Sequence, residues 1–108
     1  MRTALIFKAL SDPLRLRMIH LLTYQEELCV CHFMEVLGMP QSTVSRHLSQ
    51  LKHLGLVESR RDSKWVYYRL SNSDRLAAKD LFPLISDLTD LEPQFVLDTQ
   101  KLSQTKCD

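Results

Sequence analysis

The sequence has no long hydrophobic run, no low-complexity stretch and only two glycines in 108 residues. No apolar segment approaches the roughly 18 residues that a membrane-spanning helix needs. The first ten residues are interrupted by Arg2 and Lys8 and do not fit a secretory signal peptide. The length suits one domain with a modest core, which dimerisation would supplement. We therefore expect a cytoplasmic, single-domain protein without a membrane partner.

Cysteine is also scarce, at three residues: Cys29, Cys31 and Cys107. Three cysteines cannot all pair within one chain, so they do not form a disulfide framework of the kind found in secreted proteins. In a reducing compartment they are better interpreted as free thiols or metal ligands.

A strong net charge is absent as well, because the whole chain carries only +1. The charge is unevenly distributed, however. Residues 41–69 hold six basic and two acidic side chains, a net +4, so the rest of the chain carries −3. A basic segment within a neutral chain is expected where a nucleic acid docks, although a solvated basic face gives the same count.

Two short helices joined by a tight turn are predicted near the middle of the chain. Ser11-Asp12-Pro13 marks the start of an earlier helix. The next helix should begin near Val30 and end at Gly38, since glycine accepts the left-handed conformation that closes a helix. A third helix opens at Gln41 or Ser42 after only Met39 and Pro40. This spacing is typical of a helix-turn-helix.

A basic hairpin is predicted directly after these helices. Gly55 closes the third helix, residues 56–61 and 65–70 alternate as strands, and residues 62–64 form the turn. The sequence thus indicates a mainly α protein with a β-hairpin wing, a winged helix-turn-helix. The predicted DNA contacts are Gln41, Ser42, Thr43, Ser45, Arg46 and His47 on the helix, and Arg60, Arg61 and Lys64 on the wing.

The helical pattern returns at Ser73 and continues through Leu76, Leu81, Leu84, Ile85, Leu88 and Leu91. Pro83 should kink or split this segment near Phe82. The stripe and residues 4–7 contain more apolar side chains than are needed to cover one small wing. We expect them to form a homodimer surface. The alternative is that they complete the monomer core. We assign residues 1–92 to the DNA-binding and dimerisation domain and residues 93–108 to a polar tail that carries Cys107.

Cys29 and Cys31 lie at the expected start of the helix that precedes the recognition helix. The helix dipole favours thiolates there, and soft thiolates select zinc, cadmium, lead or trivalent arsenic. Side chains two apart in a regular helix point about 200° apart. The two sulfurs therefore converge only if Cys29 lies before the helix or its first turn deforms. There are two alternatives to a metal site. The two cysteines could be small buried apolar residues, or Cys29 and Cys31 could form a strained disulfide.

Three motifs in order resemble the ArsR/SmtB family of metalloregulatory repressors. They are Glu27-Leu28-Cys29-Val30-Cys31, the residues 42–48 (Ser-Thr-Val-Ser-Arg-His-Leu) and the residues 64–70 (Lys-Trp-Val-Tyr-Tyr-Arg-Leu). The resemblance covers about residues 10–71. It implies a winged-helix homodimer that represses a metal-resistance operon and leaves its operator when metal binds.

The chain departs from the family pattern at three places. Arsenite-sensing relatives continue as Cys-Val-Cys-Asp-Leu-Cys, whereas this chain has His32, Phe33 and Met34, so the third thiolate is missing. His32 is a candidate zinc ligand or an exposed polar residue. Cys107, an external thiol or solvent could take the third place. Ser63 stands where glycine is common at the wing tip, and Pro40 replaces a capping serine, so that Ser42 is expected to cap the helix.

The resulting expectation is a repressor that needs no cofactor to bind an inverted-repeat operator. Trivalent arsenic, bound by Cys29, Cys31 and Cys107, would release it. A zinc, cadmium or lead sensor and a thiol redox regulator are alternatives on the same fold. An enzyme would need a base and oxyanion donors around a nucleophile, and the sequence offers neither. A protein-interaction module would carry a more apolar or acidic recognition surface.

Overall fold

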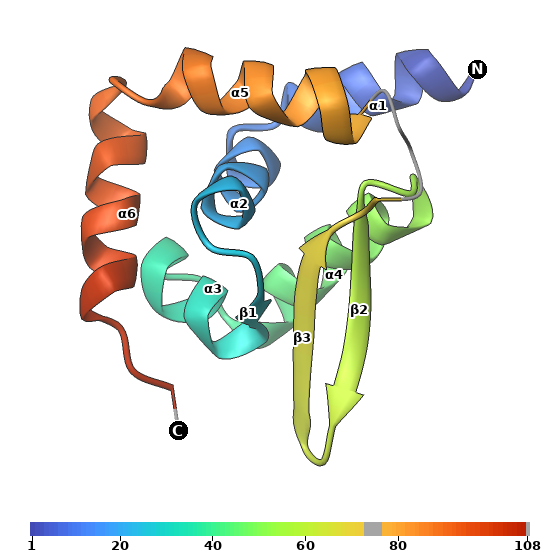
Figure 1. Ribbon diagram of the computed structural model, residues 1–108. Coiled ribbons are helices and arrows are strands. Elements are labelled where there is room, and N and C mark those ends of the chain that lie inside the picture. Colours follow the sequence, from blue (N-terminus) through green and yellow to red (C-terminus); the bar gives the residue numbers. More distant parts are fainter. Residues whose placement is uncertain (73–76, 108) are drawn as a thin grey trace.

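The computed structural model describes residues 1–72 and 77–107 and forms a winged helix-turn-helix, as predicted (Figure 1). Its elements in chain order are α1 (Arg2–Leu10), α2 (Pro13–Tyr24), β1 (Leu28–Cys29), α3 (Val30–Leu37), α4 (Gln41–His53), β2 (Val57–Asp62), β3 (Trp65–Leu70), the π-helical turn η1 (Ala77–Leu81), α5 (Phe82–Thr89) and α6 (Pro93–Gln104). None of the helices in the described ranges is long and apolar enough to cross a membrane.

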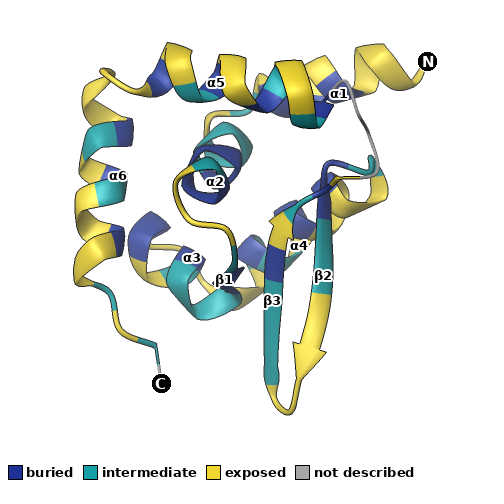
Figure 2. Cartoon of the chain, in the orientation of Figure 1, coloured by how far each residue is buried: buried dark blue, intermediate teal, exposed yellow. Residues whose placement is uncertain are grey.

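Helix α2 forms the centre of the core, with α5, α6 and α4 packed around it. Of the two possible caps at the predicted helix start, Ser11 and Asp12, the structure uses Asp12: its carboxylate accepts hydrogen bonds from the backbone N–H of Leu14 at 2.8 Å and of Arg15 at 3.3 Å. Met18 and Ile19 are completely buried. Figure 2 shows the buried residues of the surrounding helices on the sides that face α2.

The helix-turn-helix begins and ends close to the predicted residues. Helix α3 ends at Gly38, whose φ of 65° is the expected left-handed closure. Helix α4 starts at Gln41 with Pro40 at the N-cap and no side-chain cap. The expectation that Ser42 caps α4 is therefore wrong. Ser42 already lies inside the first turn, because the helix begins one residue earlier.

The wing is the antiparallel hairpin of β2 and β3, in register Arg60↔Tyr67 and Asp62↔Trp65. Ser63 at its tip has a φ of 58°, so a left-handed serine is used here at a cost of about 1 kcal/mol. The sequence did not reveal β1. This two-residue strand pairs with β3 to give a three-stranded sheet in the order β1-β3-β2.

The C-terminal third matches the prediction at Pro83 and differs beyond it. The π-helical turn ends at Leu81 and α5 begins at Phe82, so Pro83 lies in the first turn of a new helix, where its missing N–H is tolerated. The expected helix start at Ser73 and the first leucine, Leu76, lie outside the described residues. The segment expected to be a polar tail instead contains α6, which packs against α2 and α3.

Candidate thiol site and nucleic-acid interface

Cys29 is buried at the junction between β1 and α3. It is the N-cap of α3, with an extended φ of −84° and ψ of 162°, and only 2% of it is exposed. It also belongs to β1, where it pairs with Tyr67 of the wing. Cys29 thus lies before the helix, which is the placement that allows its sulfur and that of Cys31 to converge.

His32 closes the first turn of α3 around Cys29. Its Nδ1 accepts a hydrogen bond from the backbone N–H of Cys29 at 3.2 Å and lies 3.1 Å from Cys29 Sγ. The accepted N–H fixes Nδ1 as the unprotonated nitrogen of the ring. Burial lowers the pKa of the His32 imidazole, which also favours the neutral ring. His32 is therefore a capping residue: its Nδ1 lies beside the Cys29 sulfur but is engaged by the Cys29 N–H, and would bind an ion only after that hydrogen bond opens.

Cys107 reaches the same place from the other end of the chain. Helix α6 ends at Gln104, and Cys107 forms a disulfide with Cys31, with an S–S distance of 2.11 Å and a Cα–Cα distance of 6.0 Å. The potential ligand atoms of Cys29, His32 and Cys107 all lie within 4.8 Å of one another. The fold therefore gathers all three sulfurs and one imidazole, which we call the thiol cluster (Cys29, Cys31, His32 and Cys107).

The donor chemistry of the thiol cluster fits a thiophilic ion. Thiolate sulfur and imidazole nitrogen are the ligands that zinc, cadmium and softer ions prefer. Cys31 and Cys107 become ligands only after their disulfide is reduced, since the thiolate and not the neutral disulfide sulfur is the metal ligand. The cluster therefore has an oxidised form and a reduced form that offers three thiols.

The predicted DNA-contacting residues of α4 differ in exposure. Gln41, Ser42 and Arg46 are exposed, whereas Thr43 and Ser45 are half-buried. His47 is buried, at 9% exposure, and its Nδ1 lies 3.2 Å from the guanidinium of Arg15. The structure thus places His47 away from the exposed face of α4, on the side that packs against α2.

Arg15 is a residue of this candidate interface that no sequence motif indicates. Its guanidinium donates hydrogen bonds to the Ala9 carbonyl at 2.9 Å and to Gln50 Oε1 at 2.5 Å, in addition to its contact with His47. Arg15 therefore connects the end of α1 and the recognition helix α4 to α2. Only its place in the fold reveals this, because an arginine in a helix has no local sequence signature for such a role.

The three predicted wing cations separate into two kinds. Arg61 and Lys64 are exposed near the tip, and Lys64 Nζ lies 5.2 Å from the ring centroid of Trp65. Arg60 instead forms a two-bond ion pair with Glu27, at 2.6 and 2.8 Å. Arg61 and Lys64 are thus the wing cations that the structure leaves open to an external phosphate.

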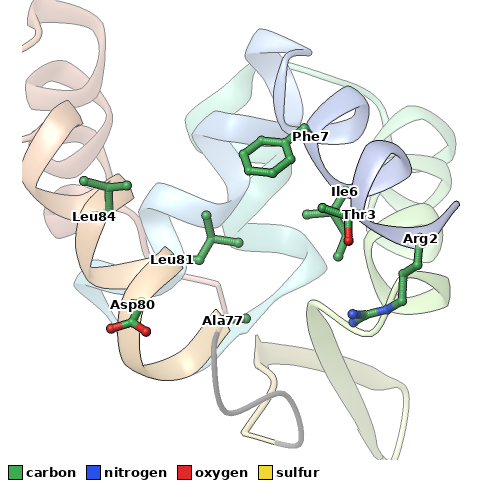
Figure 3. A pocket seen from close by; sticks show the side chains of 8 residues that line it. All are labelled: Arg2, Thr3, Ile6, Phe7, Ala77, Asp80, Leu81 and Leu84. Atoms are coloured by element: carbon green, nitrogen blue, oxygen red, sulfur yellow. The ribbon is translucent and has the colours of Figure 1, made fainter.

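A second exposed surface is apolar and lies on α1 and α5. Leu5 and Phe7 of α1 are 51% and 63% exposed, and Leu84 and Leu88 of α5 are 53% and 67% exposed. A groove of about 430 Å³ lies between α1 and the segment of η1 and α5, with Ile6 and Phe7 on one side and Leu81 of η1 and Leu84 of α5 on the other (Figure 3). Apolar side chains that gather around a groove make this surface a candidate interaction site.

A helix-turn-helix followed by a hairpin with a basic tip defines the class of winged helix-turn-helix DNA-binding proteins. Within this class, residues 12–59 match the family described as bacterial regulatory protein, arsR family. An HTH-type transcriptional regulator of Methanocaldococcus jannaschii is 38% identical over 87 residues, which are 81% of this chain and 94% of that protein. The chain belongs to the arsR family.

Two further relatives are named for metal resistance. The cadmium resistance regulatory protein CadC of Listeria innocua and the arsenical resistance operon repressor of Escherichia coli are each 46% identical over 66 residues. In both cases the match covers 61% of this chain and 56% of the relative. This chain thus spans little more than half of the length of these two relatives.

The solved structures agree with the family and the fold. The homodimeric winged helix-turn-helix domain Mb0332 from Mycobacterium bovis, described as a possible ArsR-family regulator, has a TM-score of 0.68 and 36% identity. The likeness covers 82% of this chain and 79% of that one. The family and its structural neighbours are transcriptional regulators and not enzymes.

Proposed function

We propose that this chain is a homodimeric repressor that acts in the cytoplasm and leaves its operator when trivalent arsenic binds Cys29, Cys31 and Cys107. The observation that carries this proposal is the convergence of three sulfurs at the start of α3, the helix that packs against α4. Relatives named for arsenic and cadmium resistance support the same class of inducer.

The proposed DNA-binding surface joins the exposed face of α4 to the wing tip. Gln41, Ser42, Ser45 and Arg46 would lie near base edges, where short hydroxyl side chains allow close approach and an arginine bridges guanine in a bidentate pair. Arg61 and Lys64 would contact phosphates. A twofold-symmetric dimer would place two such surfaces on an inverted repeat.

The proposed dimer interface consists of the exposed apolar residues of α1 and α5. Leu5, Phe7, Leu84 and Leu88 lie on these two elements, which border the same groove. Covering them with a second copy would remove apolar surface from water. The homodimeric state of the Mb0332 domain supports this assembly.

Release of the protein from DNA would follow from the movement of the cysteine sulfurs that ion binding requires. The reduced sulfurs of Cys31 and Cys107 would move towards Cys29, which is fixed both in β1 and at the N-cap of α3. The free energy of ion binding would then be available to distort the first turn of α3 and tilt α4. A hundredfold preference of the inducer for the DNA-incompetent shape, about 2.7 kcal/mol, would empty a moderately occupied operator.

The test is a titration of DNA release from the reduced protein with arsenite, zinc, cadmium and lead. Fluorescence anisotropy of a labelled operator reports release. We expect arsenite to act at the lowest concentration, and Cys29→Ser or Cys31→Ser to keep operator binding while losing the response. Release by arsenite from the Cys29→Ser, Cys31→Ser double variant would place the sensing site elsewhere. A stronger response to cadmium, lead or zinc would replace arsenic as the inducer.

The disulfide between Cys31 and Cys107 favours a second candidate, a thiol redox regulator. A peroxide can oxidise the two thiols: the S–S bond forms, the O–O bond breaks, and the two protons and two electrons of the thiols pass to the peroxide, which leaves as two waters or, from an organic hydroperoxide, as one alcohol and one water. Cys29 takes no part in this bond. Cys29→Ser therefore separates the two candidates: it should abolish the arsenite response and preserve any response to peroxide.

A further inference from the structure

Glu27 and Arg60 form the shortest ion pair among the described residues, and it joins the thiol segment to the wing. Arg60 donates from Nε to Glu27 Oε2 at 2.8 Å and from its terminal nitrogen to Oε1 at 2.6 Å. Its guanidinium also lies over the ring of Tyr67, 4.5 Å from the centroid. The hydrogen bonds from Arg60 lower the pKa of the Glu27 carboxyl and raise the pKa of the Arg60 guanidinium.

This ion pair is continuous with the thiol cluster through the sheet. Glu27 directly precedes β1, and Cys29 is two residues further along. In the sheet, Tyr67 of β3 is the pairing partner of Cys29 on one side and of Arg60 on the other. Arg60 is thus connected to the cysteine segment by β-sheet pairing and by a charged side-chain contact.

A second ion pair nearby lacks this connection. Arg69 donates to Glu58 Oε2 at 3.1 and 3.2 Å, and Ser71 donates to Glu58 Oε1 at 3.1 Å. Glu58 and Arg69 are register partners on β2 and β3, so their contact stays within the hairpin. The chain therefore offers a matched pair of carboxylate–guanidinium contacts, one of which links the wing to the thiol segment.

We propose that the Glu27–Arg60 pair transmits a change at Cys29 to the wing, and that Arg60 is a positioning residue and not a phosphate contact. This inference rests on the proposed function, in which the thiol cluster binds the inducer. When Cys29 is displaced, β1 and Glu27 move with it, and the ion pair between Glu27 and Arg60 breaks. The hairpin then shifts, and Arg61 and Lys64 leave the phosphates. An exposed ion pair contributes little to stability and is therefore easily broken.

The test measures the ratio of operator dissociation constants with and without arsenite. Glu27→Gln keeps the shape of the side chain and removes its charge. We expect it to reduce this ratio about fivefold or more relative to the unmodified protein, and Arg60→Gln to reduce it equally. Arsenite binding, followed by the ultraviolet absorbance of arsenic–thiolate bonds, should stay unchanged. Glu58→Gln is the matched control and should keep the original ratio.

A charge-exchanged variant, Glu27→Arg with Arg60→Glu, retains an ion pair and should restore most of the ratio. A circular-dichroism melt verifies that each variant is folded, and the exchange supplies the test if a single variant is not. Because both single variants release the hairpin, we expect each to weaken operator binding without arsenite, and to the same degree. If Arg60 contacted phosphate, only Arg60→Gln would weaken that binding, and Glu27→Gln would strengthen it by freeing Arg60. That pattern would overturn the inference.

The two proposals fail in different ways. If the unmodified protein binds arsenite and stays on the operator, the proposed inducer is wrong, and the same ratio is then measured between disulfide and reduced protein. If the unmodified protein is released and Glu27→Gln is released to the same degree, the proposed function stands and the Glu27–Arg60 link is wrong.

Discussion

The thiol cluster lies at the start of α3, and the exposed polar face lies on α4, which packs against α3, yet the side chains of the two regions are used in opposite ways. Within the described part of the chain, Gln41, Ser42 and Arg46 make no hydrogen bond or ion pair to another side chain. In the thiol cluster, Cys29 pairs with β3 and contacts His32, and Cys31 is bonded to Cys107. A surface that meets an external ligand keeps its polar groups free. A sensor needs connections, because chemistry at an isolated residue would change nothing elsewhere.

The largest effect on operator binding is expected from a substitution in the exposed apolar surface of α1 and α5. Leu88 on α5 is 67% exposed, and a charge there would have to be buried in the proposed dimer. Leu88→Glu should therefore give a monomer whose operator binding is at least about a hundredfold weaker, because one half-site supplies only part of the contacts. Size-exclusion chromatography with light scattering measures the assembly state, and anisotropy measures operator binding.

Leu97→Glu is the control for the Leu88 substitution. Leu97 is 59% exposed but lies on α6, outside the α1–α5 surface. It should leave both the dimer and operator binding unchanged. A folded Leu88→Glu protein that remained dimeric would show that α5 is a free surface without a partner in this assembly.

The next effect tests whether the free polar groups of α4 recognise bases. Arg46→Ala should cost about 1–3 kcal/mol of operator binding and relax the sequence preference at one position of each half-site. Lys64→Ala should weaken binding to all sequences alike and lower its salt dependence. Competition between the operator and single-base variants measures both. Equal sequence preference in Arg46→Ala and the unmodified protein would remove Arg46 from the base-reading set.

The same contrast explains how much the sequence could predict. The helix-turn-helix and the hairpin follow from local signals, such as the cap at Asp12, the left-handed Gly38 and the alternation of β3. Cys107 reaches Cys31 only because α6 packs against α2 and α3, and α6 has few apolar residues. Strand β1 is two residues long and exists only through its pairing with β3. Local patterns do not encode such long-range contacts.

A third prediction tests whether Cys107 is a ligand of the proposed arsenic site. Cys107→Ser removes the disulfide and one thiolate, while Cys29 and Cys31 remain. Outer-shell partners of metal ligands are typically worth 10–100-fold in affinity. Loss of a ligand itself should therefore weaken the arsenite response by about tenfold or more. Operator binding without arsenite should not change.

Anisotropy titrations of the reduced proteins measure this response. An unchanged arsenite response in Cys107→Ser would mean that solvent or an external thiol completes the site. The thiol cluster would then be connected to α6 only in its oxidised form.

The smallest expected effect concerns the way α6 is held against α2 and α5. His20 of α2 is 3% exposed, and its Nδ1 donates to Thr89 Oγ1 at 2.8 Å, because that hydroxyl itself donates to the Ile85 carbonyl at 2.7 Å. Its Nε2 has no hydrogen-bond partner among the described residues. The ring packs edge-on against Phe95 of α6, at 5.0 Å between centroids.

Burial lowers the pKa of His20 from its ordinary value of 6.5, although the carboxylates of Asp98 and Asp90 act in the opposite direction. As the pH falls below 6.5, the unfolded chain binds a proton at His20 before the native protein does. The free energy of unfolding should therefore decrease from pH 7 towards pH 5. His20→Gln should show a shallower decrease in urea unfolding at several pH values. His32 and His47 also have lowered pKa values but are present in both proteins, so the difference in slope isolates His20. Equal slopes of unfolding free energy against pH in the two proteins would mean that water reaches His20 in the native protein. The contact between His20 and α6 would then not exclude water.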